Sequence, residues 1–182
     1  MKSMRELRKT LGLVAIMIAA CLAVGAGAIA TEKEGALPPA PSSPAFDHLK
    51  ALAGDWIMTG GDGSVAASYK VTANGSAVRE TIFPGSPHEM LTVYTMEGGD
   101  IVLTHYCVLG NQPHMKAARG TPANQLAFKY AGGGNIKAPT DQHMHDATIT
   151  FVDADHITSE WAMYQDGKQT EVKKFDLTRK KI

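Results

Sequence analysis

The stretch that decides the fold is SVAASYKVTANGSAVRETIF, residues 64–83. From Val65 to Val71 every second residue is apolar or aromatic, which is the two-residue period of a half-buried strand. The dipeptide Asn74-Gly75 tolerates the left-handed backbone of a tight turn, and a second alternating run follows it. The stretch therefore predicts two antiparallel strands joined by a short turn.

The same period continues almost to the end of the chain. It predicts a strand at Trp56 and further strands at 89–96, 101–108, 114–119, 125–130, 143–152, 156–164 and 169–179. Most connections are short and rich in Gly, Asn and Asp, which favours antiparallel neighbours. Closing such a meander into a barrel removes its exposed edges. We therefore expect an all-β, antiparallel up-and-down barrel of about nine or ten strands.

Two segments depart from this period. The run FDHLKALAGDW, residues 46–56, has apolar residues at helical spacing and predicts one short N-terminal helix, with Asp47 as its N-cap. Residues 132–142 begin with three glycines and carry no alternation, so they predict a long flexible loop.

The N-terminus is typical of an export signal. Residues 1–10 carry four basic side chains and one acid, and residues 11–30 are uncharged and apolar. The small residues Ala28 and Ala30 favour cleavage after Ala30, which would deliver the protein to the periplasm or outside the cell. Two alternatives remain open: an uncleaved membrane anchor, for which twenty residues suffice, and lipid attachment at Cys21 in a sequence that resembles a bacterial lipobox.

The rest of the chain reads as a Pro-rich linker, 31–45, and one barrel domain, 46–182. Removing residues 1–30 takes away four of the 18 basic residues and one of the 18 acidic ones, leaving 14 against 17. A mildly acidic domain without a basic stripe argues against nucleic acid and anionic membrane surfaces as partners. The one cysteine left after cleavage, Cys107, has no disulfide partner in the chain and is expected to be buried and inert.

The tripeptide Gly54-Asp55-Trp56, placed at the head of the first strand, resembles the Gly-x-Trp signature of the lipocalin-like (calycin) barrels. In those barrels a basic residue of the last strand covers the tryptophan. The resemblance gives Trp56 and Arg179 these structural roles, and a guanidinium stacked on an indole stabilises a fold by about 0.5–2 kcal/mol.

Over residues 46–179 the chain is also similar to a bacterial group of exported lipocalin-like proteins, notably in PGSPHEM at 84–90 and THYCVLGNQPHM at 104–115. That resemblance implies a barrel but brings no activity with it. A weaker similarity is to the nitrobindin-like haem-binding barrels. Their glycine follows the tryptophan more closely than Gly60 follows Trp56, and no haem-ligating histidine is carried over.

Six of the seven histidines lie between residues 88 and 156. His143 and His145 alternate in step with Ala147 and Ile149, so in a regular strand they point into the barrel about 6–7 Å apart. Two imidazoles at this spacing can bind Zn, Cu, Fe or Ni, and His105, on the inward face of its own strand, would be the third ligand.

Glu80 is expected to be a buried carboxylate that holds a histidine tautomer or completes the metal shell. The alternative is that these polar groups line a lumen or are held by hydrogen bonds, with Tyr94 among the partners.

The leading functional hypothesis is a binding barrel for a small, largely apolar molecule. Its predicted polar contacts are Glu80, Tyr94, His105, His143 and His145. The alternatives are a metal-dependent enzyme that activates water or oxygen, a haem-binding barrel, and a structural or interaction protein with a filled core. We assign no catalytic residue, since the chain has no HExxH or paired CxxC motif, and the oligomeric state stays open.

Overall fold

The computed structural model describes residues 37–181. The predicted signal segment, 1–30, lies outside the described residues, and so do residues 31–36 of the predicted linker. The described part contains a helix, a 3-10 turn and ten strands. Their bounds are α2 Pro44–Ala51, β1 Gly54–Met58, β2 Val65–Thr72, η1 Ala73–Gly75, β3 Ala77–Ile82, β4 Met90–Glu97, β5 Asp100–Tyr106, β6 Gln112–Ala117, β7 Gln125–Gly134, β8 His143–Phe151, β9 His156–Gln165 and β10 Lys168–Arg179.

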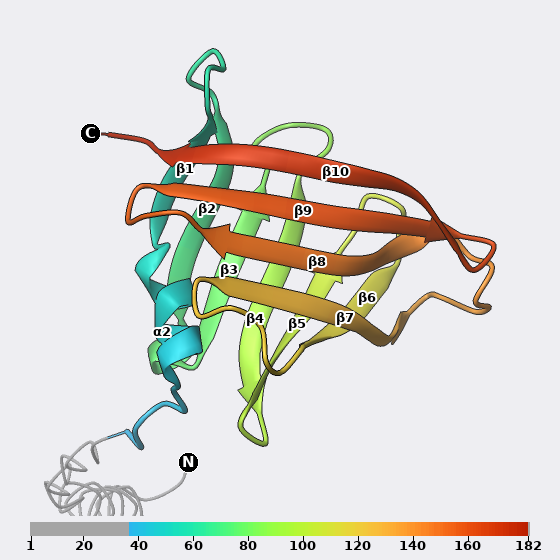
Figure 1. Ribbon diagram of the computed structural model, residues 1–182, viewed down its shortest axis with the longest axis horizontal. Coiled ribbons are helices and arrows are strands. Elements are labelled where there is room, and N and C mark those ends of the chain that lie inside the picture. The colour runs from blue at the N-terminus through green and yellow to red at the C-terminus, as the bar shows by residue number, and fades with distance from the viewer. Residues whose placement is uncertain (1–36, 182) are drawn as a thin grey trace, which may run out of the picture. The chain divides into compact units, whose positions relative to one another are not determined.

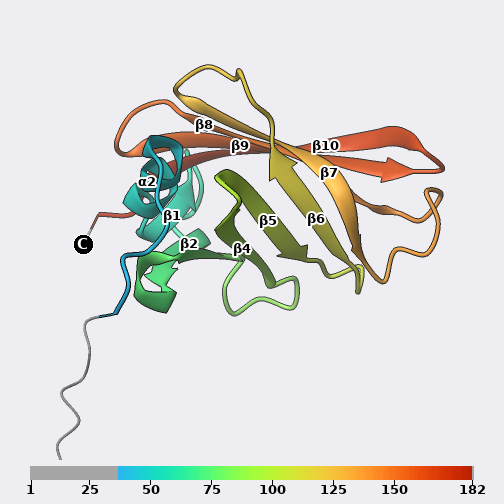
Figure 2. The same ribbon diagram turned by 90° about the horizontal axis from the view of Figure 1, so that it is seen from below.

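The ten strands form one closed antiparallel barrel in which each strand pairs with its neighbours in sequence and β10 closes against β1. Figure 1 shows β7 to β10 as one curved layer that crosses in front of β3 to β5, and Figure 2 shows this layer edge-on, above β4 and β5. The predicted fold class, an all-β up-and-down barrel with one short helix, is confirmed. Within residues 37–181, no helix is long and apolar enough to cross a bilayer.

Helix α2 begins earlier than the sequence predicted. Ser43 is the N-cap, because its hydroxyl accepts a hydrogen bond from the backbone N–H of Phe46 at 3.2 Å, and Pro44 follows it at a position that suits proline. Asp47, the predicted cap, is instead one turn inside the helix, where it pairs with Lys50. Phe46 and Leu49 are fully buried and fasten the helix to the end of the barrel.

Strand β7 is longer than predicted, because it includes the three glycines that we assigned to a loop. Gly133 pairs with Pro113 and Gly134 with Gln112 on β6. A Cβ atom at Gly133 would lie 2.8 Å from the backbone oxygen of Gln112. These glycines therefore permit a close approach of two strands rather than a flexible loop.

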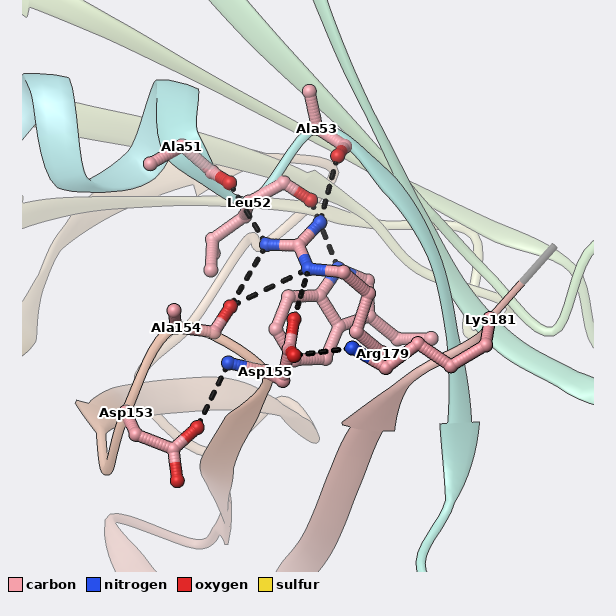
Figure 3. Close-up of polar contacts among 9 residues, drawn as sticks. Ala51, Leu52, Ala53, Asp153, Ala154, Asp155, Arg179 and Lys181 are labelled. Carbon is pink, nitrogen blue, oxygen red and sulfur yellow. Dashed lines mark hydrogen bonds and ion pairs between the residues drawn. The ribbon is translucent and has the colours of Figure 1, made fainter.

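The helix end of the barrel is closed by Trp56 and Arg179 (Figure 3). The guanidinium carbon of Arg179 lies 4.5 Å from the centroid of the fully buried Trp56 ring, whose N–H donates to the backbone oxygen of Leu52 at 2.8 Å. Arg179 donates to the backbone oxygens of Ala51, Ala53 and Ala154 and to the carboxylate of Asp155. These bonds satisfy carbonyls that the end of α2 leaves without partners.

Candidate functional site

An apolar cavity of about 340 Å³ lies inside the barrel, at the end opposite helix α2. It sits where β3 ends, β4 begins and β5 ends, and the β5–β6 connection forms its rim with Val108 and Leu109 exposed. Its polar lining side chains are His105, His88 and Lys173, of which the last two are exposed. The apolar lining includes Phe83, Met90, Met144, Trp161, Met163 and Phe175.

His105 is the buried polar residue of this cavity, with 1% of its surface exposed. Its Nδ1 lies 3.0 Å from the hydroxyl of Thr92 on β4, and its ring packs against Trp161 at 4.8 Å between centroids. Burial lowers the pKa of His105 to about 4, so the ring is uncharged at neutral pH. Its Nε2 is buried and has no hydrogen-bond partner among the described residues.

Glu80 lies beside Thr92, its cross-strand partner on β4. The carboxylate accepts hydrogen bonds from the hydroxyls of Tyr69 at 2.6 Å and Tyr94 at 2.7 Å. Burial raises the pKa of Glu80, while hydrogen bonds from the two tyrosines and Thr92 act in the opposite direction. Burial, followed by the charge of Glu80, raises the pKa of both tyrosines well above the ordinary value. Glu80 and Tyr94 therefore do not line the cavity, and among the described residues they are connected to His105 only through Thr92.

His143 and His145 line a different cavity, of about 270 Å³, which shares no residue with the apolar one. The sequence predicted that both point into the barrel with Ala147. This prediction was wrong. Met144 pairs with Met163 and Asp146 pairs with Ala162, so His145 has no partner on β9 and forms a bulge in β8. The bulge breaks the two-residue alternation, so Met144, between the two histidines, lines the apolar cavity instead.

The predicted metal site of His105, His143 and His145 is therefore not formed. His105 belongs to the apolar cavity, whereas His143 and His145 belong to the second one. In residues 37–181 no group of three or more His, Cys, Asp or Glu side chains is arranged to hold a metal ion. The physical reason is the extra residue in β8, which moves the histidine pair away from the lumen that His105 faces.

The main cavity-lining residue that the sequence did not single out is Trp161. It is buried, lines the apolar cavity and donates from its indole N–H to Ser159 at 3.0 Å. The signal was present in the sequence, since Ile157, Ser159, Trp161 and Met163 alternate along a predicted strand. Cys107 also lines this cavity, and burial raises the pKa of its thiol, as expected for an unreactive cysteine.

The arrangement is suited to binding. A largely apolar wall offers surface to an apolar molecule, and one uncharged imidazole with an unused nitrogen offers it a single hydrogen bond.

No family model matches the chain, and a comparison with curated proteins finds no match either.

Proposed function

We propose that this protein binds a small, largely apolar molecule that carries one hydrogen-bonding group. The observation that carries the proposal is the buried Nε2 of His105, which has no hydrogen-bond partner in the described part of the chain and lies beside a largely apolar cavity of about 340 Å³. Leaving a buried polar atom unpaired costs about 1–3 kcal/mol, which a ligand group that bonds to it would recover.

The polar network behind His105 supports this proposal. Thr92 holds Nδ1, and Glu80 with its two tyrosine donors adjoins Thr92 on the neighbouring strand. Buried groups that are fixed in this way lose little freedom when a ligand binds. In this proposal His105 makes the polar contact with the ligand, Glu80 and Tyr94 belong to the network next to Thr92, and His143 and His145 lie outside this cavity.

Naphthalene and 1-naphthol, which differ by one hydroxyl, test this proposal by calorimetry on the purified protein. We expect both to bind, and 1-naphthol to bind about fivefold more tightly, since one net hydrogen bond contributes about 1 kcal/mol. His105→Leu should abolish this preference while leaving naphthalene binding intact, and His114→Gln, on the exposed face of β6, should change neither. Failure of both compounds to bind would favour a filled structural core.

A second pair of variants localises the binding. Met90 lines the cavity, whereas Met96, on the same strand and also partly buried, does not. Met90→Phe should weaken naphthalene binding, and Met96→Phe should not. Equal effects would place the compound elsewhere. An absorption spectrum with a Soret band would instead indicate that the cavity holds haem.

We also propose that the protein is exported and related to the lipocalin-like (calycin) barrels. Export rests on residues 1–30 alone, and the relationship is supported by the ten-stranded meander together with the stack of Arg179 on Trp56. Mass spectrometry of the mature protein distinguishes a chain that begins at Thr31 from a lipidated chain that begins at Cys21. A full-length chain would indicate an uncleaved anchor.

A further inference from the structure

The second cavity has a composition unlike the first. His143 and His145 of β8 meet Tyr130 of β7 and Tyr164 of β9 there, and residues 136–139 of the β7–β8 connection form the opposite wall. The ring of His145 stacks on Tyr164 at 4.0 Å and on Tyr130 at 4.9 Å between centroids. These contacts hold the imidazole in one orientation.

The hydrogen bonds of the two histidines fix where their protons lie. Nδ1 of His143 is 2.7 Å from the backbone oxygen of Asp141, and a carbonyl oxygen can only accept, so Nδ1 carries the proton. Nδ1 of His145 is 3.0 Å from the carboxylate of Asp146, which is also paired with Lys129 and therefore accepts as well. In each uncharged ring the lone pair is on Nε2.

No residue within 37–181 binds the lone pair of His143. His143 is 2% exposed, and its Nε2 is buried without a hydrogen-bond partner among the described residues. A buried nitrogen of this kind is costly unless something binds to it. Because the ring lines the cavity, the cavity is the route by which a ligand reaches it.

The hydrogen bonds of the two imidazole rings and the spacing between the rings are those expected for binding one metal ion. An imidazole that binds a metal through Nε2 characteristically donates its other N–H to a carbonyl or a carboxylate, as both rings do here. The ring centroids are 5.4 Å apart, and two imidazoles bound at about 2 Å in adjacent positions on one tetragonal or tetrahedral ion would have centroids roughly 4.5–5 Å apart.

We propose that His143 and His145 bind one divalent transition-metal ion through their Nε2 atoms. Imidazole nitrogens favour Cu²⁺ over Zn²⁺ and other first-row ions. Since the described residues offer no third His, Cys, Asp or Glu ligand, solvent or a small anion completes the coordination. The site is separate from the apolar cavity and does not depend on the function proposed for it.

Titration of the purified, tag-free protein with Cu²⁺, followed by calorimetry and electron paramagnetic resonance, tests the proposal. We expect one tight equivalent whose spectrum shows coupling to two imidazole nitrogens. His143→Ala and His145→Ala should each weaken binding by at least about tenfold and leave coupling to one imidazole. His114→Ala, an exposed histidine on β6, is the matched control and should change nothing.

The circular dichroism spectrum and the urea unfolding curve of each variant serve as its folding check, so that loss of the fold is distinguished from loss of the ion. His145 is less buried than His143, with 31% of its side chain exposed, and its variant is the one expected to fold best. The proposal is overturned if the wild-type protein takes up no stoichiometric Cu²⁺, or if binding survives both histidine substitutions.

Discussion

The two ends of the barrel differ in whether their polar groups have hydrogen-bond partners. At the helix end, Arg179 covers Trp56 and donates to three backbone oxygens and one carboxylate, all within the chain. At the cavity end, Nε2 of His105 has no partner among the described residues. The first arrangement pairs its polar groups within the chain, whereas the second leaves one polar atom free to meet the proposed ligand. If the proposed binding holds, stability and binding reside at separate ends of the barrel, and substitutions can test this division.

The largest expected effect is at the closed end. Arg179→Met removes the cation from Trp56 and its charged hydrogen bonds to the oxygens of Ala51 and Ala53, which water then solvates, so the free energy of unfolding should fall by about 3 kcal/mol. Urea denaturation measures this loss. Lys174→Met, on the same strand, removes only an exposed ion pair with Glu160 and should cost under about 1 kcal/mol. Equal losses of unfolding free energy in the two variants would mean that the contacts of Arg179 give the helix end no particular stability.

The next effect is a pH dependence at the cavity end. The pKa of His105 is about 4 in the folded protein and about 6.5 in an unfolded chain, so the unfolded state binds the extra proton between these values. The contribution of His105 is therefore present above pH 6.5 and is lost as the pH falls towards 4. Between pH 7 and 5 this amounts to about 2 kcal/mol.

Comparison with His105→Gln isolates this contribution, since glutamine does not titrate. The pKa of Glu80 is raised, so its own contribution is present below pH 4.5 and is lost as the pH rises through the folded pKa, the opposite direction. Both proteins contain Glu80, and their difference cancels its effect. If wild type and His105→Gln lose stability in parallel between pH 7 and 5, His105 is not buried in the uncharged form.

A smaller effect is expected between the two ends, where Glu80 lies. Tyr94→Phe removes the hydroxyl that donates to the Glu80 carboxylate at 2.7 Å, and we expect a loss of about 1.5 kcal/mol in the free energy of unfolding. Tyr106→Phe is the matched control, because Tyr106 is 48% exposed. Thermal or urea unfolding of both variants provides the measurement, and a neutral Tyr94→Phe would mean that Glu80 is satisfied without it.

Strands β5 and β8 explain how much the sequence could predict. The alternation around His105 placed it on the inward face of the barrel, and β5 pairs with β4 without a register shift, so this prediction is confirmed by the burial of His105. The same reasoning was wrong for His143 and His145, because β8 contains an extra residue. One inserted residue moves the later side chains of the strand to the opposite face of the sheet. Nothing in the sequence HMHDATITF indicates where the insertion lies.

The polar network could be predicted only in part. Alternation indicated that Glu80 is buried, but its donors depend on which residues lie opposite in the neighbouring strands. Tyr69 is its partner on β2 and Thr92 its partner on β4, and a single sequence does not specify the register of either pair. The caps show the same limit, since Ser43 and Asp47 are both good N-caps and the packing of Phe46 and Leu49 decides between them.

The smallest expected effect on stability separates binding from folding most cleanly. Leu109 lies at the rim of the apolar cavity and is 43% exposed, so Leu109→Ser should change the free energy of unfolding by under about 0.5 kcal/mol. The same substitution removes apolar surface from the bound naphthalene and should weaken its binding by about threefold. Leu37→Ser, at a leucine that is 69% exposed and outside the cavity, should leave binding unchanged. If Leu109→Ser instead destabilises the fold, the rim is part of the core, and the division between a stabilising end and a binding end fails there.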